Sequence, residues 1–182
     1  MNLLNTLSIL ENSDPLHLGR LLVLLGAFAK REESGTIEGL TKLAKLDFLL
    51  RYPVYLEKAL LKKNASLKGL NIIEHERKSV ESAMVRYRYG PWDFRYRRLI
   101  NILVAKGLAY VVIRGKTIQI GLTKEGIDSA EALANQEEFQ DIAQRASLLK
   151  RYFDLKGTTL MKFIYETFPE IGTLRLGEEI ES

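Results

Sequence analysis

The chain has 182 residues, 46% of them hydrophobic and 27% charged, so it is long and apolar enough to fold around one core and is not a disordered protein. It contains no cysteine, which excludes disulfides, thiolate zinc sites and cysteine nucleophiles and suits a reducing cytoplasm. Residues 84–98 carry five arginines against one aspartate, a local charge equal to the net charge of +4 of the whole chain, whereas residues 166–182 are acidic.

A first helix is predicted from Asp14 to about Lys30. Aspartate is a good N-cap, and Pro15 at the first helical position loses no hydrogen bond because that amide has no helical partner. Apolar residues then recur at helical spacing: Leu18, Leu21, Leu22, Leu25 and Phe28. The apolar run 21–29 is far shorter than the roughly 20 residues that a membrane span needs, and no basic region precedes it, so we expect a cytoplasmic protein without a signal peptide.

Two further helices are expected before a polar loop at residues 62–69. The second helix carries Ile37, Leu40, Leu43, Ala44 and Phe48 on one side. It is expected to end near Tyr52, because a residue that precedes proline disfavours the helical region of backbone space. Pro53 can then start a third helix that runs through about Leu60.

The period changes to two from Ser82 onwards. Apolar and tyrosine residues alternate there with arginines, which predicts a strand over 83–89 with Arg86 and Arg88 on its open face. Gly90-Pro91 ends the strand, and Asp93 can cap a helix that runs to about Lys106. At 100° per residue, one arc of this helix is apolar and is expected to face the core: Tyr96, Leu99, Ile100 and Leu103.

The next segment predicts a hairpin and then more helices. Two β-prone runs, 108–113 and 117–122, flank Arg114-Gly115-Lys116, which is a turn signal with a basic tip. Thr123 can cap a helix that continues through Ala134. Two helical patterns follow, at about 136–153 and 158–168.

This order of elements predicts an α+β, mostly helical fold, and it resembles a winged helix-turn-helix domain. The resemblance rests on Leu103-Val-Ala-Lys-Gly-Leu108, the hairpin, and Leu122-Thr-Lys-Glu-Gly126, which are similar to the end of many winged-helix regulators. It covers roughly residues 14–134. We therefore expect a winged-helix domain with N-terminal helices at residues 1–134, and a C-terminal helical extension with an acidic tail at residues 135–182.

The basic segment is a candidate nucleic-acid surface. Arg98 and Asn101 are residue types that contact guanine and adenine edges, and flanking arginines neutralise phosphates. The candidate residues are Arg86, Arg88, Arg95, Arg97, Arg98, Asn101, Arg114 and Lys116. If about six of these cations met phosphates of double-stranded DNA, log affinity would fall against log salt with a slope of roughly −5. The same side chains equally suit a protein interface, in which arginine and tyrosine are enriched, and a solvated charged face is the third possibility.

The helix predicted over 158–168 is apolar around most of its circumference. One stripe comprises Leu160, Phe163, Ile164 and Thr167, and a second comprises Met161, Tyr165 and Phe168. Because one stripe suffices to cover a core, the second is a candidate contact with the preceding helix or with another polypeptide, which includes a second copy of this chain.

A narrower resemblance covers most of the chain. The segments "LTKLAKLDFLLRYP" at 40–53, "RYGPWD" at 88–93 and "IYETFPEI" at 164–171 are similar to the small middle component of bacterial ABC-three-component systems, which include the Lamassu type of anti-phage defence. The resemblance implies an accessory subunit that bridges an SMC-like ATPase and an effector, often a nuclease. A homodimeric transcriptional regulator that binds operator DNA is the alternative that the winged-helix pattern leaves open.

No pattern for catalysis or for a cofactor is present in the sequence. There is no glycine-rich phosphate loop, no paired-carboxylate metal pattern and no serine elbow. Asp47 lies in an apolar helical stretch and is expected to pair with Arg51 four residues on. His17 and His75 are expected to be structural or surface residues. We therefore expect a protein that is not an enzyme and that needs no metal or cofactor.

Overall fold

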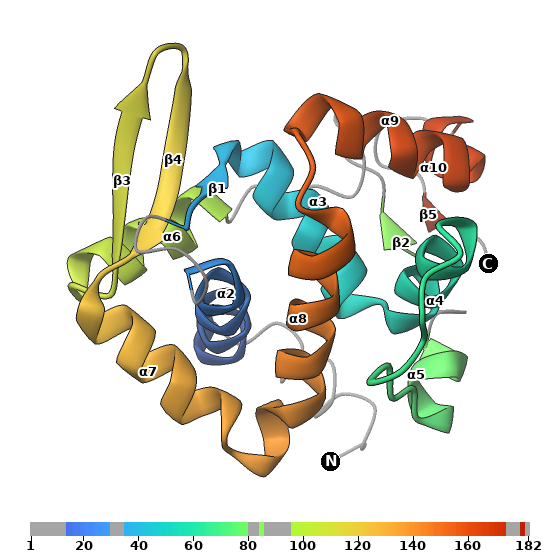
Figure 1. Cartoon of the computed structure of the whole chain (residues 1–182), viewed down its shortest axis with the longest axis horizontal. Coiled ribbons are helices and arrows are strands. Elements are labelled where there is room, and N and C mark those ends of the chain that lie inside the picture. Colours follow the sequence, from blue (N-terminus) through green and yellow to red (C-terminus); the bar gives the residue numbers. More distant parts are fainter. Residues whose placement is uncertain (1–13, 30–34, 80–83, 86–95, 174–178, 181–182) are drawn as a thin grey trace.

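The computed structural model describes residues 14–29, 35–79, 84–85, 96–173 and 179–180. These residues form an α+β fold that is mostly helical and contains a three-stranded antiparallel sheet, which confirms the predicted class (Figure 1). In the same residues, every helix is too short or too polar to span a bilayer.

Helix α2 (Asp14–Ala29) runs through the middle of the molecule (Figure 1). It contacts α6 (Tyr96–Ala105), α7 (Lys124–Ala134), α8 (Gln140–Phe153) and strand β4 (Thr117–Leu122). Neighbours on several sides explain why residues 19–26 are buried without a break, the charged Arg20 among them.

The predicted second helix begins later than its apolar pattern suggested. Ile37 belongs to strand β1 (Ile37–Glu38), which pairs antiparallel with β4 and places Ile37 opposite Ile120. Helix α3 (Gly39–Arg51) starts at Gly39, whose φ of +79° is accessible to glycine at little cost. A two-residue strand is too short to show an alternating pattern, so the helical spacing of the apolar residues led to the prediction that Ile37 belongs to the helix.

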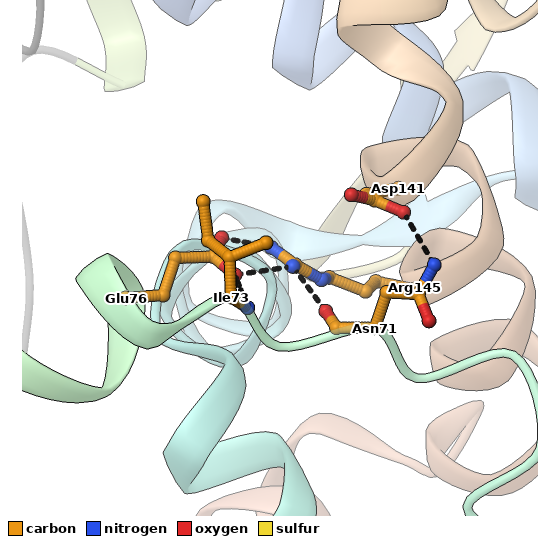
Figure 2. A network of polar contacts seen from close by, with 5 residues as sticks. All are labelled: Asn71, Ile73, Glu76, Asp141 and Arg145. Carbon is orange, nitrogen blue, oxygen red and sulfur yellow. Dashed lines mark hydrogen bonds and ion pairs between the residues drawn. The ribbon is translucent and has the colours of Figure 1, made fainter.

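Helix α4 (Pro53–Lys62) has proline at its start, as predicted, and the short helix α5 (Glu74–Ser79) was not predicted. Figure 2 shows how the segment before and within α5 is attached to α8. The buried guanidinium of Arg145 lies 2.7 Å from both carboxylate oxygens of Glu76 and donates to the carbonyl of Asn71, and the Asn71 amide donates to Asp141 at 3.2 Å. The Glu76 carboxylate also accepts from the amide of Ile73 at 3.1 Å.

The predicted hairpin is present. Strands β3 (Ala109–Arg114) and β4 pair antiparallel from Ala109 opposite Leu122 to Arg114 opposite Thr117, and Gly115 occupies the turn with φ +62°. The sheet order is β1-β4-β3, so β3 is an edge strand. Figure 1 shows the hairpin projecting away from the helices, with its turn at the far end.

Two other predicted features fall partly outside the described residues. Of the predicted strand at 83–89, only β2 (Met84–Val85) is described, and it pairs with β5 (Glu179–Ile180). Helix α6 is described from Tyr96, and Asp93, its predicted cap, lies outside the described residues. The predicted apolar arc of α6 is confirmed, because Tyr96, Leu99, Ile100 and Leu103 are all buried.

The C-terminal helices complete one continuous core. The Thr123 hydroxyl accepts from the amide of Gly126, which confirms it as the cap of α7. The 3-10 turn η1 (Glu137–Phe139), α8, α9 (Gly157–Thr167) and α10 (Pro169–Thr173) follow. Side chains of α8 and α9 belong to the same buried cluster as those of α2, α3 and α6, so the core crosses the boundary predicted at residue 134.

Candidate nucleic-acid interface

Helix α6 has a buried face and a charged face. Its apolar arc lies in the core, whereas Arg97, Arg98 and Asn101 are exposed. This separation follows from the sequence, because those three residues lie outside the arc of the four buried ones at 100° per residue. The structure thus places the predicted arginine and asparagine side chains of α6 where a partner can reach them.

A buried polar network fixes the position of α6. The Tyr96 hydroxyl donates to the Asp47 carboxylate of α3 at 2.5 Å. Arg20 of α2 donates to both oxygens of the same carboxylate, at 2.6 Å and 3.0 Å, and its guanidinium also lies 2.7 Å from His17 Nδ1. Three helices therefore meet at one ionised carboxylate. Asp47 was expected to pair with Arg51, and the structure corrects this: among the described residues Asp47 accepts hydrogen bonds from Arg20 and Tyr96, while Arg51 adds a favourable charge.

The carboxylate of Asp47 stays ionised although it is fully buried. Desolvation is the largest single effect and favours the neutral acid, but the charge and hydrogen bonds of Arg20, the charge of Arg51 and the hydrogen bond from Tyr96 together hold the pKa of Asp47 below its ordinary value. Burial, followed by the negative charge of Asp47, raises the pKa of Tyr96 well above its usual range. The network is therefore a structural ion pair that orients α6.

Arg98 already has an anionic partner within the chain. Its guanidinium donates to both carboxylate oxygens of Asp14, at 3.3 Å and 2.5 Å, and its side chain remains 61% exposed. Exposed ion pairs contribute only about 0–1 kcal/mol, so an approaching phosphate can compete with Asp14 for this guanidinium.

The basic residues of the hairpin are separated from those of α6. Arg114 ends β3 and Lys116 lies in the turn, and both are exposed. Six residues of strand at about 3.3 Å each place this tip roughly 20 Å from the base of the hairpin, beside which α6 lies. Among the described candidate residues, the basic side chains therefore form two separate groups. Arg86, Arg88 and Arg95, which complete the predicted surface, lie outside the described residues.

The shaft of the hairpin is unexpectedly apolar. Val111, Val112 and Ile113 of β3 are all exposed, and Ile113 is exposed to 78%. Because successive strand residues point to opposite faces, both faces of the edge strand carry apolar side chains. Three consecutive apolar residues, Val111-Val112-Ile113, precede the basic turn in the sequence. This run indicates an apolar strand surface, which the prediction of a DNA-contacting wing did not take into account.

The predicted partner stripe of α9 is only partly on the surface. Met161 is exposed, and the Tyr165 ring lies 5.9 Å below the ammonium of Lys45. Phe168 is 1% exposed and packs edge-on against Phe48 and Tyr55. Phe168 is therefore a residue of the chain's own core, and its prediction as a partner contact is wrong. It follows the last residue of α9 as the C-cap of that helix.

The two histidines differ in their surroundings. His17 is buried beside Arg20, which supports its expected structural role, and His75 is exposed on α5. Within the described ranges, no three histidine, aspartate or glutamate side chains are grouped so as to hold a metal ion.

Comparison with known proteins gave no relative: no family model, no curated protein and no solved structure matches the chain.

Proposed function

We propose that the chain is a winged-helix protein without catalytic activity that acts as an accessory subunit of an SMC-like, DNA-sensing defence complex. The observation that carries the winged-helix assignment is the sheet order β1-β4-β3 with helix α6 directly before the β3–β4 hairpin. In a winged helix, the helix before the wing is the one that enters the major groove. Here that helix turns Arg97, Arg98 and Asn101 outward.

The apolar hairpin favours a subunit over a protein that works alone. A wing that contacts only phosphates needs cations and polar groups, whereas exposed Val112 and Ile113 on an edge strand match the apolar core of a protein interface. We therefore assign the shaft of the hairpin to a protein partner, in this proposal the ATPase or the effector. The exposed face of α6 and the hairpin tip are assigned to double-stranded DNA.

A homodimeric regulator that binds operator DNA is the second candidate. The outward Arg97 and Asn101 on α6 suit base and phosphate contacts without any ATPase. The two proposals differ in the partner of the hairpin: a different protein in the first case, and a second copy of this chain in the second.

One pair of variants separates the two surfaces. Charge reversal at three exposed basic positions, Arg97→Glu with Arg114→Glu and Lys116→Glu, is expected to weaken binding to a DNA duplex, because three phosphate contacts are lost. The slope of log affinity against log salt should become shallower by about 3. Fluorescence anisotropy over a salt series measures both quantities. The control reverses three exposed lysines elsewhere, Lys62, Lys68 and Lys156, and is expected to leave the slope unchanged.

The second variant, Val112→Ser with Ile113→Ser, is expected to keep DNA affinity and to abolish co-elution with a co-expressed SMC-like ATPase and effector. Unchanged DNA binding in the charge-reversal variant, together with failed assembly, would show that the basic residues form a protein interface. A stable homodimer that dissociates on Val112→Ser with Ile113→Ser and binds one operator sequence would instead support the regulator.

A further inference from the structure

Strand β3 is an outer strand of its sheet, and the described part of the chain places no strand beside its outer edge (Figure 1). Thr123 donates its backbone N–H to the carbonyl of Leu108 at 3.1 Å, just before β3 begins. Because backbone groups point to alternate sides along a strand, every second residue from Leu108 is oriented toward β4. The backbone N–H and C=O groups of Val111 and Ile113 therefore point away from the sheet.

Both of these outward-pointing residues are accessible and apolar. Val111 is 40% exposed and Ile113 is 78% exposed. Their side chains continue the core-facing side of the sheet, because Val111 lies opposite the buried Ile120 and Ile113 lies opposite Ile118. A strand edge that combines outward backbone groups with apolar side chains is a template for one more strand. The occupant that fits it is an extended segment with apolar residues on the same side.

The charge along this edge favours a different protein over a second copy. Residues 106–119 carry three cations, Lys106, Arg114 and Lys116, and no acidic residue. Antiparallel pairing of two copies would set the tip of each hairpin beside Lys106 of the other, and parallel pairing would set the two tips together. Both arrangements bring like charges together, which is unfavourable across paired strands. A strand with carboxylates is attracted to the same edge.

We propose that β3 binds an extended segment of a partner protein as a fourth, antiparallel strand of the sheet. The segment has apolar residues beside Val111 and Ile113 and carboxylates at the end that lies near Lys106. Antiparallel order follows from the greater stability and frequency of such pairs. This inference rests on the proposed assignment of the hairpin shaft to a protein partner, and it adds that main-chain hydrogen bonds hold that partner while the basic turn remains available to DNA.

The probe that tests this is the synthetic peptide Thr-Val-Thr-Val-Thr-Glu-Glu, acetylated and amidated at its ends. Heteronuclear NMR of the full-length chain follows its titration to millimolar concentration. The amide signals of Val111 and Ile113 are expected to shift, and their hydrogen exchange is expected to slow by about tenfold, because the peptide supplies their missing hydrogen-bond partners. The amide of Val112 already points toward β4, so its exchange rate is expected to stay unchanged.

Modified peptides separate the contribution of the backbone from that of the charge. N-methylation of both valines removes the donors to Val111 and Ile113 and is expected to weaken binding by about tenfold. N-methylation of the two inner threonines, whose N–H groups point away from β3, is the matched control and is expected to change affinity by less than about threefold. Replacement of both glutamates by lysine is expected to weaken binding by about tenfold at low salt.

Variants of the chain test the same edge from the other side. Val111→Pro removes an outward N–H but no donor to β4, so the hairpin is expected to persist while peptide affinity falls by about tenfold. Val111→Thr keeps the N–H and the β-branched shape and is expected to bind the peptide like the wild type. Lys106→Glu leaves the strand itself unaltered and is expected to reverse the preference between the glutamate and lysine peptides. Circular dichroism melting checks the fold of each variant.

Three results would overturn the proposal. The first is the absence of shifts at Val111 and Ile113 with millimolar peptide, and the second is equal affinity for the valine-methylated and threonine-methylated peptides. The third is a dimer of the isolated chain that dissociates in Val111→Pro, which would identify a second copy as the occupant. The peptide experiment contains neither DNA nor ATPase, so its failure leaves the salt dependence of DNA binding as a separate test of the proposed function.

Discussion

Asp47 is the residue on which the orientation of α6 most depends. Its carboxylate is fully buried and joins Arg20 of α2 to Tyr96 of α6. The partner could not be predicted from the sequence, because Arg20 is 27 positions away and Arg51, at helical spacing, offered a local alternative. Only the tertiary arrangement that brings Arg20 of α2 to Asp47 of α3 decides between them.

The replacement Asp47→Ala is expected to lower the free energy of unfolding by about 3–5 kcal/mol, because it leaves the Arg20 guanidinium buried without its carboxylate. Urea denaturation followed by circular dichroism measures this change. The control Asp128→Ala removes an exposed carboxylate of α7 and is expected to cost less than about 0.5 kcal/mol. If Asp47→Ala and Asp128→Ala lowered the free energy of unfolding equally, the buried ion pair would contribute no more to stability than an exposed carboxylate.

Lys45 is expected to make the free energy of unfolding depend on pH in the alkaline range. It is 2% exposed, and desolvation lowers its pKa from 10.5 to about 8. Above pH 8 the folded protein therefore releases this proton, whereas the unfolded chain keeps it until about pH 10.5. Because the unfolded state then binds more protons, stability is expected to rise with pH, by about 2 kcal/mol between pH 8 and pH 10.

The variant Lys45→Met should abolish this rise, which urea denaturation at several pH values detects. Lys62→Met, at an exposed position of α4, is the matched control and should retain it. A rise that survives in Lys45→Met would have to come from another group. The tyrosines act in the opposite direction: burial raises the pKa of Tyr55 and Tyr96, so ionisation of the unfolded chain above about pH 10 lowers stability.

At the scale of elements, the position of α7 depends on a close approach of two backbones. A side-chain carbon at Gly126 would lie 1.8 Å from the carbonyl oxygen of Leu108, at the start of the hairpin. The change Gly126→Ala is therefore expected to displace α7 and to cost about 3 kcal/mol in unfolding free energy.

Gly157→Ala is the control, because Gly157 starts α9 and the nearest described atom to a side-chain carbon there is Lys42 Cβ, at 3.8 Å. We expect this variant to change stability by less than about 0.5 kcal/mol, or to increase it slightly. Calorimetric melting of both variants compares the two glycines. If Gly126→Ala left the unfolding free energy unchanged, α7 would move at no cost and would not support the hairpin.

Elements with a strong local signal could be predicted from the sequence, and two short ones could not. Helix α2 carries its own apolar period and α7 its threonine cap, and the hairpin is marked by a glycine turn between β-prone runs. Strand β1 is two residues long and depends on pairing with β4, and α5 is polar and depends on Arg145 of α8. Both depend on residues far away in the sequence, which local patterns do not reveal.

For the molecule as a whole, the core does not follow the boundary predicted at residue 134. Helix α8 contributes Ala146, Leu149 and Phe153 to the cluster that also contains Leu21 of α2 and Leu46 of α3. A chain of residues 1–134 is therefore expected not to fold, because the surfaces of α2 and α3 that α8 covers would be exposed to water.

Thermal melting followed by near-ultraviolet circular dichroism tests this expectation. A chain that ends at residue 173 keeps α8, α9 and α10 and is expected to melt in one cooperative transition. A cooperative transition in residues 1–134 would instead support the domain boundary predicted at residue 134.

The candidate interface could be predicted in part. The outward Arg97, Arg98 and Asn101 followed from the helical period, because an amphipathic helix fixes its exposed side once its buried side is known. The partner of Arg98 did not follow, because Asp14 is 84 positions away. The apolar character of the β3 surface was visible as Val111-Val112-Ile113, but its exposure depends on the hairpin projecting beyond the helices.

The pair between Arg98 and Asp14 has a consequence for how an anion could bind to α6. Asp14 lies in the first turn of α2, where the positive end of the helix dipole favours a carboxylate. If a phosphate takes over the guanidinium, Asp14 is left beside this second source of positive potential. In the proposed function, Arg98 therefore exchanges the Asp14 carboxylate for a phosphate, and Asp14 keeps the favourable potential of the α2 N-terminus.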